Sequence, residues 1–407
     1  MNPRIATLSL LLAGIPISSA TAKTITVCAD GCHHTSINAA IDSASDGDVI
    51  QLFAERYLEG APIDPLGKAI TLRGTAGPIG RPTTIIDGLD QHDLVHCHHH
   101  ETRETILESL EFRAGSVFIN GEAASEDGSS ARPTNPTIRD CWFTEHHEDH
   151  ALLALHSPVM VERCVFTENS YEYGCLNDIG ASRFNPGPPG GTYRNCVFRG
   201  NTGHLVMTLG ERVLMTGATI AENQVFHIIN HRSYARGTRL VNSVIENHEA
   251  IDVIQGHGEE ITIEDCMFRN NFRENGTRVI INTIGTMEIR GCHFEEDSGR
   301  GTLLHNSGQD TSMSAADCTF DRCREDVSDL HSKPYIDLGG NIFPVECDSV
   351  CPADFNGDGL VDGGDFARVL AQWGACDDDC PGDLDGNGSV DSSDLGLMLA
   401  HWGPCGP

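Results

Sequence analysis

One short phrase recurs along the chain and restricts its fold more than any other feature. Each copy has a cysteine, then any residue, then a phenylalanine, often followed three positions later by an asparagine. The six clear copies begin at Cys141, Cys164, Cys196, Cys266, Cys292 and Cys318, and degenerate copies place Leu110, Ala218 and Ser243 in the same slot. Successive slots are 22 to 32 residues apart, mostly 22 to 26. The chain is therefore largely an array of one short unit.

The repeated unit contains short strands and no helix. Its cysteine and phenylalanine alternate with other residues, which is the period of a strand, and a second short apolar run follows in each copy. The two longest spacings contain insertions rich in Pro, Gly, Ser or Asn, at 125–136 and 185–191, as expected of exposed loops. Two or three strands per unit predict a coil that turns once per repeat. We expect a mainly β, single-stranded parallel β-helix of about 10–12 turns.

Stacked turns, about 4.8 Å apart, would align equivalent residues into columns. The Cys and Phe columns then become ladders in the core. The Asn column lies at a turn where amides can bond to one another, and its members are Asn169, Asn201, Asn223 and Asn271. Because a disulfide needs Cβ atoms about 3.8 Å apart, we predict that the ladder cysteines are buried free thiols rather than disulfides or nucleophiles.

The N-terminus predicts export. A short basic start is followed by an apolar run at 5–17 and an A-x-A site ending at Ala22, so residues 1–22 are read as a signal peptide, with an N-terminal anchor as the alternative. No other stretch is long and apolar enough to insert in a membrane. In an oxidising compartment we expect Cys28 and Cys32 to form a small disulfide loop. The net charge of −32 argues against nucleic acid and anionic lipid as partners.

The sequence at the beginning of the coil indicates how its open end is covered. Residues 36–44 are predicted to form a short amphipathic helix, and the strands are predicted to start at 47–52, so that the helix covers the open end of the coil. Together with the repeat, this resembles the pectate-lyase-like superfamily of right-handed parallel β-helices. The resemblance implies that fold for a domain spanning residues 23–346.

The last segment, 347–407, is a different module. It carries 12 acidic residues and one basic residue, and it repeats itself with a period of 29. Each copy places oxygen-bearing residues at positions 1, 3, 5, 9 and 12 of a loop and Gly at position 6, as EF-hand calcium loops do. The predicted ligands of the two Ca²⁺ ions are Asp354, Asn356, Asp358, the Leu360 carbonyl, Asp362 and Asp365, and then Asp383, Asp385, Asn387, the Ser389 carbonyl, Asp391 and Asp394. A solvated acidic tail, the alternative, would not repeat this spacing twice.

One helix is predicted after each loop, at 366–373 and 395–402. Tandem loops with Asp at position 12 resemble a type I dockerin domain, in the variant flanked by cysteines. The resemblance implies a cohesin-like or cell-surface anchoring partner. Repeat symmetry favours disulfides 351–376 and 380–405, with 351–405 and 376–380 as the alternative. The sequence assigns no role to Cys97, Cys175, Cys323 or Cys347.

A column of polar residues after the second strand of several units is the candidate catalytic site. Its candidate catalytic members are His231, Arg232, Asp252, His257 and His305. Amides and one further imidazole accompany them: His156, Asn230, Gln255, Asn282 and Asn306. Imidazoles can move protons near neutral pH, and Arg can neutralise a uronate, so such a wall suits an extended saccharide. The alternative is turn decoration and hydrogen-bonded ladders. The histidines at 98–100 and at 146, 147 and 150 could bind a transition metal or simply form polar turns.

Two functions stay open at this point. The first is a secreted polysaccharide lyase or glycosidase, and the second is a non-catalytic glycan-binding or surface-display module. The Arg-x-Pro-x-x-Arg of pectate lyases is missing, as are the acid pair and Arg-Ile-Lys of polygalacturonases, although Gly256-His257-Gly258 is present.

Overall fold

The computed structural model describes residues 21–122, 132–147, 150–171, 174–179, 189–231, 236–258, 260–271, 278–295, 302–308, 310–321, 327–328, 333–344, 353–355, 360–375, 381–385 and 387–404. The chain divides into two compact units, Met1–Thr319 with Ser328–Asn341, and Phe320–Val327 with Ile342–Pro407. The predicted signal peptide falls almost entirely outside the described ranges. Within those ranges, no helix combines the length and the apolar character that a membrane span requires.

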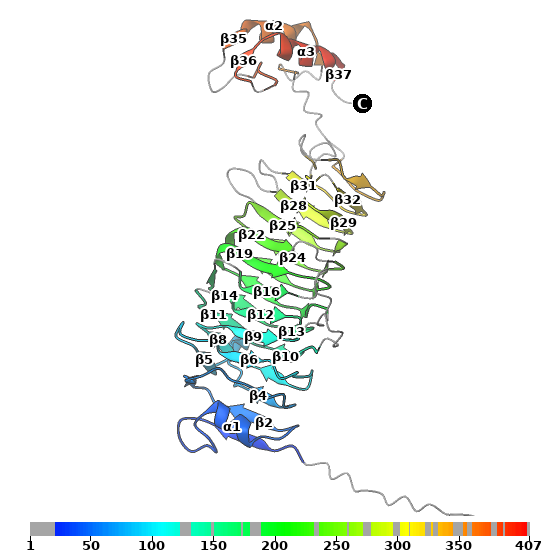
Figure 1. Cartoon of the computed structure of the whole chain (residues 1–407). Helices are drawn as coiled ribbons and strands as arrows, with labels where there is room; N and C mark the ends of the chain where they lie inside the picture. Colours follow the sequence, from blue (N-terminus) through cyan, green and yellow to red (C-terminus); the bar gives the residue numbers. More distant parts are fainter. Residues whose placement is uncertain are drawn as a thin grey trace, which may run out of the picture. The chain divides into compact units, whose positions relative to one another are not determined.

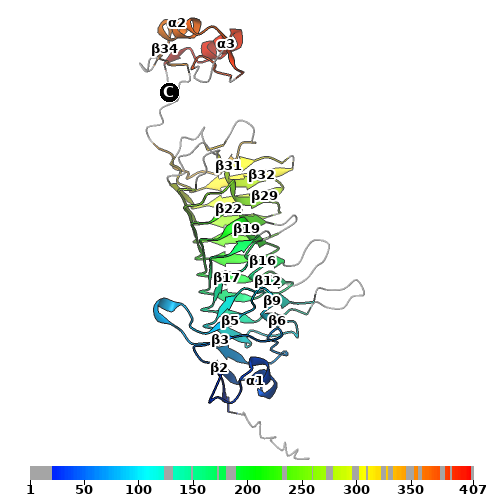
Figure 2. The same ribbon diagram turned by 90° about the vertical axis from the view of Figure 1, so that its left-hand side faces the viewer.

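The first unit is a parallel β-solenoid, in which each turn of the chain stacks on the turn before it (Figures 1 and 2). Each turn visits three parallel sheets in the same order, and each strand pairs with its equivalent one turn later. In the described residues, sheet A has 13 strands: β1 (Thr24–Val27), β2 (Val49–Leu52), β4 (Thr71–Arg73), β7 (Ile106–Glu108), β10 (Thr137–Arg139), β13 (Met160–Glu162), β17 (Thr192–Arg194), β20 (Leu214–Thr216), β23 (Arg239–Val241), β26 (Ile261–Glu264), β29 (Gly285–Arg290), β32 (Thr311–Ala316) and β33 (Ile336–Asp337).

Sheet B carries the repeated phrase. Its described strands number 10: β3 (Arg56–Tyr57), β5 (Ile85–Asp87), β8 (Glu111–Arg113), β11 (Trp142–Thr144), β14 (Val165–Thr167), β18 (Val197–Arg199), β21 (Thr219–Ala221), β24 (Val244–Glu246), β27 (Met267–Arg269) and β30 (His293–Glu295). The residue before each ladder cysteine has a positive φ, for example 56° at Asp140 and 53° at Asn195. Asp and Asn tolerate this left-handed conformation, which turns the chain from sheet A into sheet B.

Sheet C holds the longest strands and, as shown below, the candidate site. In the described residues it runs through β6 (Val95–Cys97), β9 (Val117–Asn120), β12 (Leu152–Leu155), β16 (Leu176–Ile179), β19 (Thr202–Leu209), β22 (Gln224–His231), β25 (Asp252–Gly256), β28 (Arg278–Asn282) and β31 (Thr302–Asn306), and β15 (Ser170–Tyr171) pairs with β19. One short 3₁₀ turn, η1 (Pro78–Gly80), lies in a loop between sheets A and B. The coil of stacked strands is thus the predicted fold.

The predicted ladders are confirmed. The six ladder cysteines are buried and free. The rings of Phe143 and Phe166 stack with centroids 4.4 Å apart, and those of Phe166 and Phe198 are 4.6 Å apart. Asn169 donates from Nδ2 to Oδ1 of Asn201 at 3.0 Å, and Asn201 donates likewise to Asn223 at 2.9 Å. Identical buried residues therefore interact directly across successive turns.

The N-terminal end of the coil also agrees with the sequence. Helix α1 (Ile37–Ser43) starts after the N-cap Ser36, whose side chain accepts from the Ala39 N–H, and it buries Ile37 and Ile41. The helix packs on β1 and β2, where it covers the first turn (Figure 1). Cys28 and Cys32 form the expected disulfide. Cys97 and Cys175, unassigned from the sequence, are buried free thiols.

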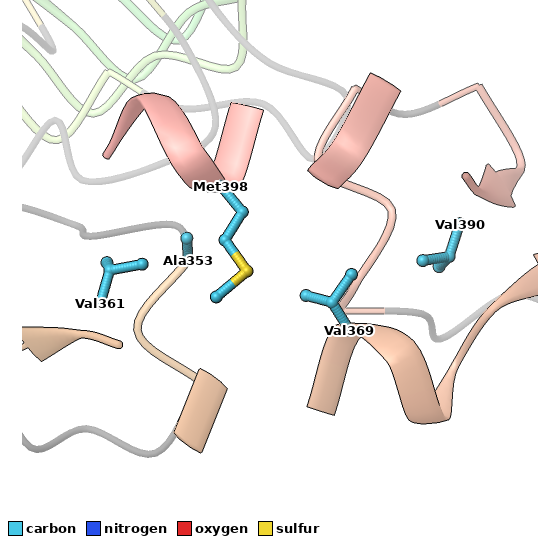
Figure 3. Packing of buried hydrophobic residues seen from close by; sticks show 5 residues of the cluster. All are labelled: Ala353, Val361, Val369, Val390 and Met398. Atoms are coloured by element: carbon cyan, nitrogen blue, oxygen red, sulfur yellow. The ribbon is translucent and has the colours of Figure 1, made fainter. Parts of the chain in front are cut away.

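The second unit contains two short helices and two small antiparallel pairings. Helices α2 (Gly363–Ala371) and α3 (Ser392–Ala400) begin three residues before the predicted starts and end two residues before the predicted ends. Strand β34 (Leu360–Val361) pairs with β37 (Gly403–Pro404), and β35 (Gly374–Ala375) pairs with β36 (Ser389–Val390). Each copy of the repeat thus pairs with the other. Figure 3 shows the small core that they share, which consists of Ala353, Val361, Val369, Val390 and Met398.

Candidate functional site

A charged cluster joins three consecutive turns at sheet C. His227 of β22 is in register with Asp252 of β25, which is in register with Arg278 of β28. The Asp252 side chain is 1% exposed, whereas His227 is 19% and Arg278 39% exposed. Arg278 donates from Nε to Oδ1 of Asp252 at 2.6 Å. A carboxylate buried to this degree needs such a partner, because desolvation of an unpaired charge is costly. We call these residues the three-turn cluster.

The imidazole of His227 faces the other carboxylate oxygen. Its Nδ1 lies 3.1 Å from Oδ2 of Asp252, although the two atoms are not aligned as a hydrogen bond. The ring and the carboxylate are thus close enough to interact electrostatically. An imidazole placed between a carboxylate and the solvent can accept a proton and hold it.

Two aromatic side chains extend this cluster along the surface. The ring of His204, on β19, contacts Phe226 with centroids 5.3 Å apart and His227 at 5.5 Å. Phe226 is 44% exposed, whereas the phenylalanines of the Cys-x-Phe slots are buried. Beside it lies a pocket of about 210 Å³ lined by Gly203, Gln224, Val225, Phe226 and Glu249. An exposed ring next to a pocket offers a flat apolar face to a ligand.

The structure distributes the five predicted catalytic residues unevenly. Asp252 is central to the three-turn cluster. His257 follows β25, and its Nδ1 bonds to Oγ1 of Thr283. Burial lowers the pKa of His257, the charge of His227 lowers it further, and Asp252 acts in the opposite sense, so all three are electrostatically coupled. His305 lies half-buried on β31, and Arg232 lies outside the described residues.

His231 has a different position from the one expected. Its side chain is 1% exposed, and burial lowers its pKa to about 4. Because adjacent residues of a strand face opposite sides, the predicted single wall divides into two columns. Asn230, Gln255 and His305 belong to a partly exposed column, in which Asn230 donates to Gln255 at 3.3 Å and the buried Ile281 separates Gln255 from His305. His231, Asn282 and Asn306 form a buried column that is closed to a polymer.

His227, Arg278, His204 and Phe226 were missed by the sequence reasoning, yet a signal was present. His227 lies 25 residues before Asp252, and Arg278 lies 26 residues after it, which is one repeat in each direction. Aligning the turns by their Cys-x-Phe slots would have placed the three residues in one column.

The histidines at 146, 147 and 150 line a second pocket, of about 260 Å³, together with His92 and Asp93. His146 is not available to a ligand there. It is buried, its Nδ1 accepts from the Gly115 N–H, and its Nε2 pairs with the Phe112 carbonyl. His150 pairs through Nε2 with Nδ2 of Asn177 at 2.9 Å. His146 and His150 thus support the coil as polar turn residues.

The second unit contains an acidic site in its second loop. One carboxylate oxygen from each of Asp383, Asp385 and Asp394 lies within 4.8 Å of the others. The N–H groups of Asn387 and Gly388 donate to Asp383 at 3.1 and 2.8 Å, which turns its carboxylate into the loop. Gly388, at loop position 6, has φ of +87°, the left-handed turn that this position requires. Three clustered carboxylates fit a hard divalent cation such as Ca²⁺.

The carboxylate at position 12 of this loop is tied to the backbone. Asp394 is buried and accepts from the N–H groups of Leu384 and Asp391, each at 2.8 Å. Burial works to raise the pKa of Asp394, but these backbone donors outweigh it and hold the pKa below its usual value. Asp391, at position 9, caps helix α3 through Oδ1. The Ser389 carbonyl belongs to β36.

The first loop repeats this arrangement where it is described. Asp365 is buried and accepts from the N–H of Phe355 at 2.8 Å and of Asp362 at 3.1 Å, as Asp394 does in the second loop. Asp362 caps helix α2. Asp354, at loop position 1, and Leu360, at position 7, are described, whereas Asn356 and Asp358 lie outside the described residues. The predicted pairing partners Cys351, Cys376, Cys380 and Cys405, with the unassigned Cys323 and Cys347, also lie outside them.

Comparison with known proteins gives similarity at the level of solved structures. No protein-family model and no curated protein matches the chain. The A-module of the Azotobacter vinelandii mannuronan C-5 epimerase AlgE6 is similar with a TM-score of 0.48 and 15% identity, over 76% of this chain and 94% of that one. A PL6 alginate lyase in complex with a trisaccharide gives 0.46 and 11% identity, over 80% and 85%. The family 28 exopolygalacturonase of Yersinia enterocolitica gives 0.32 and 11%, over 80% and 79%. Similarities this low do not extend to individual side chains.

Proposed function

We propose that the coil binds and cleaves an acidic polysaccharide along sheet C, and that the second unit is a calcium-binding, dockerin-type anchor of an exported protein. The observation that carries the first part is the three-turn cluster, in which a buried carboxylate holds an imidazole and a guanidinium side by side at a partly exposed position. Phe226 and the pocket beside it supply the apolar contact that a sugar ring needs.

The chemistry that suits this cluster is a lyase reaction. Arg278 pairs with the carboxylate of a uronate, which stabilises charge that develops on it. His227 removes the proton from the carbon next to that carboxylate, and Asp252 stabilises the imidazolium that forms. The bond from the neighbouring carbon to the glycosidic oxygen breaks, a carbon–carbon double bond forms, and the leaving oxygen takes a proton from water. The coil itself supplies the base and the cation that this reaction needs.

The test is a panel of neutral, uronate and sulfated polysaccharides, with unsaturated and reducing ends measured separately. Wild-type protein should release unsaturated ends from a uronate polymer, and His227→Gln and Arg278→Gln should each reduce the rate at least about 100-fold. His293→Ala, at an exposed residue of β30, is the matched control and should retain full activity.

Two other outcomes separate the alternatives. Binding to a polymer without product release, unaffected by His227→Gln, would favour a non-catalytic glycan-binding module. Neither binding nor release, by a protein with intact circular dichroism, would overturn the proposal for the coil.

The proposal for the second unit rests on the loop geometry. Asp383, Asp385 and Asp394 would hold one Ca²⁺, and the equivalent residues of the first loop would hold another. Calorimetric titration should give two calcium ions per chain, and Asp383→Ala should leave one. A cohesin-like or cell-surface partner would then be retained by wild-type protein only when calcium is present.

The proposal also includes export of the protein and a right-handed coil. Cleavage after Ala22 should place Lys23 at the N-terminus of the mature protein, as sequencing of secreted material would show. A right-handed coil is the hand that parallel crossover connections favour.

A further inference from the structure

Two imidazoles and a carboxylate meet near the beginning of the coil, far along the chain from the three-turn cluster. One potential ligand atom from each of Asp64, His98 and His99 lies within 4.8 Å of the other two. His99 Nδ1 is 3.2 Å from Oδ1 of Asp64, and the rings of His98 and His99 have centroids 4.1 Å apart. We propose that these three side chains bind a divalent transition-metal ion of the zinc type.

Strand pairing brings the three residues together from distant parts of the sequence. Ile63 forms a parallel bridge with Val95 of β6, and its N–H donates to the Leu94 carbonyl at 2.8 Å. His96 N–H in turn donates to the Ile63 carbonyl at 2.9 Å. Asp64 therefore lies alongside the end of β6, and His98 and His99 follow directly after this strand.

A buried carboxylate fixes the two backbone segments that carry the ligands. Glu101 is fully buried and accepts from the His99 N–H at 3.0 Å and from the Gly67 N–H at 3.1 Å. It thereby ties the loop after β6 to the loop after Asp64. The Leu66 N–H donates to Oδ1 of Asp64 at 2.8 Å, which orients the carboxylate. Groups behind the ligands that hold them in position are a regular feature of metal sites.

The spacing and the donor types fit zinc better than calcium. Tetrahedral zinc with bonds of about 2.0–2.2 Å separates neighbouring ligand atoms by about 3.3 Å. The 3.2 Å between His99 and Asp64 agrees with that edge. Imidazole nitrogen is a ligand for late first-row metals, whereas calcium selects oxygen. Because His98 and His99 are exposed, a fourth position would be open to water or to a small ligand.

A bound ion would also hold the first turns of the coil together. Asp64 belongs to one turn and the two histidines to the next, so the ion bridges them where β6 begins sheet C. Binding to the folded state alone stabilises it by mass action. The site would thus raise the thermal midpoint of the coil when metal is added.

The experiment uses the full chain in excess Ca²⁺, so that the acidic loops are occupied, and titrates Co²⁺ while the visible absorption of the metal is recorded. We expect one equivalent of Co²⁺ to bind with an intense visible band, and Zn²⁺ to displace it. His98→Ala and Asp64→Asn should each weaken binding at least 10-fold. The asparagine retains an acceptor for the Leu66 N–H, so it preserves the turn. His293→Ala should bind Co²⁺ as wild type does.

Circular dichroism and thermal melting without metal show whether each variant is folded as wild type is. Absence of the band, or equal Co²⁺ affinity in wild type, His98→Ala and Asp64→Asn, would overturn the proposal and leave Asp64–His99 as a simple ion pair.

Discussion

Buried carboxylates have different partners in the coil and in the second unit. In the coil, Asp252 is held by Arg278 and His227 from the turns on either side. Glu108 is likewise held between Arg73 and Arg139, its own partners one turn away in each direction. The regular stacking places a cation next to an anion wherever the two occupy one column. Asp252 and Glu108 therefore find their partners within the coil itself.

The segment 347–407, which makes up most of the second unit, has almost no cationic side chain that could act in this way. Arg368 is the single Lys or Arg in 347–407, and its guanidinium donates to the Phe355 carbonyl rather than to a carboxylate. Asp394 is buried on backbone N–H donors, with Asp383 and Asp385 beside it. If this group binds calcium as proposed, a cation from outside relieves the mutual repulsion of its carboxylates. The comparison therefore predicts that the coil is stable without an added ion and that the second unit needs one.

Removal of calcium should produce the largest difference between the two units. In the described part of the second unit, five buried apolar residues and the four half-buried ones packed against them form a core that is small for a segment of this length. We expect chelation to unfold the second unit completely and to leave the coil unchanged. Hydrogen exchange measured by mass spectrometry checks this, because amides of α2 and α3 should exchange rapidly while those of sheets A to C stay protected.

Two variants sharpen this test. Asp394→Ala should reproduce the unfolding of the second unit in the presence of calcium, whereas Asp252→Asn should leave its calcium response unchanged. Protection of α2 and α3 that is the same with chelator and with calcium would contradict the dependence on an ion.

Loss of one ladder ring should have the next largest effect, confined to the coil. Phe166 is fully buried and stacks on Phe143 and Phe198, so Phe166→Ala removes contacts to two turns at once. We expect a loss of about 3–5 kcal/mol in the free energy of unfolding, read from urea denaturation. Phe226→Ala, at an exposed ring, should cost less than about 0.5 kcal/mol.

A calcium titration of Phe166→Ala tests whether the two units influence each other. We expect the calcium affinity of this variant to equal that of wild type, because a change in the stability of the coil should not alter the second unit. A coupled change in calcium affinity would show that the coil supports the second unit.

The ladders explain why so much of the fold was predictable. Cys164, Phe166 and Asn169 occupy fixed positions of a turn, so the same core contact demands the same residue in each copy, and the spacing is visible in the sequence. The helix at 37–43 was predictable from its N-cap and its apolar face. The loops of the second unit were located from the repeated spacing of their acidic residues and glycines, and calcium binding by these loops stays a prediction.

The site was only partly predictable, because the register between strands of successive turns decides which residues share a column. Asp252 was chosen without His227 and Arg278, which lie one repeat away on each side. His231 was placed with the surface residues although its neighbour Asn230 already occupied that face. Strand alternation decides which of two adjacent polar residues is exposed, and a bend or an insertion shifts it without a mark in the sequence.

The asparagine ladder should show a somewhat smaller effect than the rings. Asn201 donates from Nδ2 to Asn223 Oδ1 and to the Phe166 carbonyl, and its Oδ1 accepts from Asn169. Asn201→Ala leaves these groups buried and unpaired, and we expect a loss of about 3 kcal/mol in unfolding free energy. Asn270→Gly removes an exposed amide pair with Asn247 and keeps the left-handed backbone of this residue, whose φ is 50°, so it should be nearly neutral. Equal effects of the two variants would show that the ladder does not stabilise the coil.

The smallest expected effect is a loss of unfolding free energy at acid pH. In the coil we expect it to arise from a buried histidine. His146 occupies the asparagine ladder as a neutral ring, with Nδ1 accepting from Gly115 N–H and Nε2 paired with the Phe112 carbonyl. Burial lowers its pKa to about 3. The folded protein therefore binds this proton less readily than the unfolded chain does, whose histidine pKa is about 6.5. Its stabilising contribution is complete above pH ~6.5 and is lost as the pH falls toward about 3.

Asparagine can make both hydrogen bonds of His146 without titrating, so His146→Asn removes this dependence. Between pH 7 and pH 5, with calcium present, the coil of wild type should lose about 2 kcal/mol more unfolding free energy than the variant does. The exposed neighbour gives the control, because His147→Asn should behave as wild type. Urea denaturation at the two pH values measures the difference. If His146→Asn and wild type lose the same free energy on acidification, the acid sensitivity of the coil arises from its carboxylates, and the contrast with the second unit disappears at low pH.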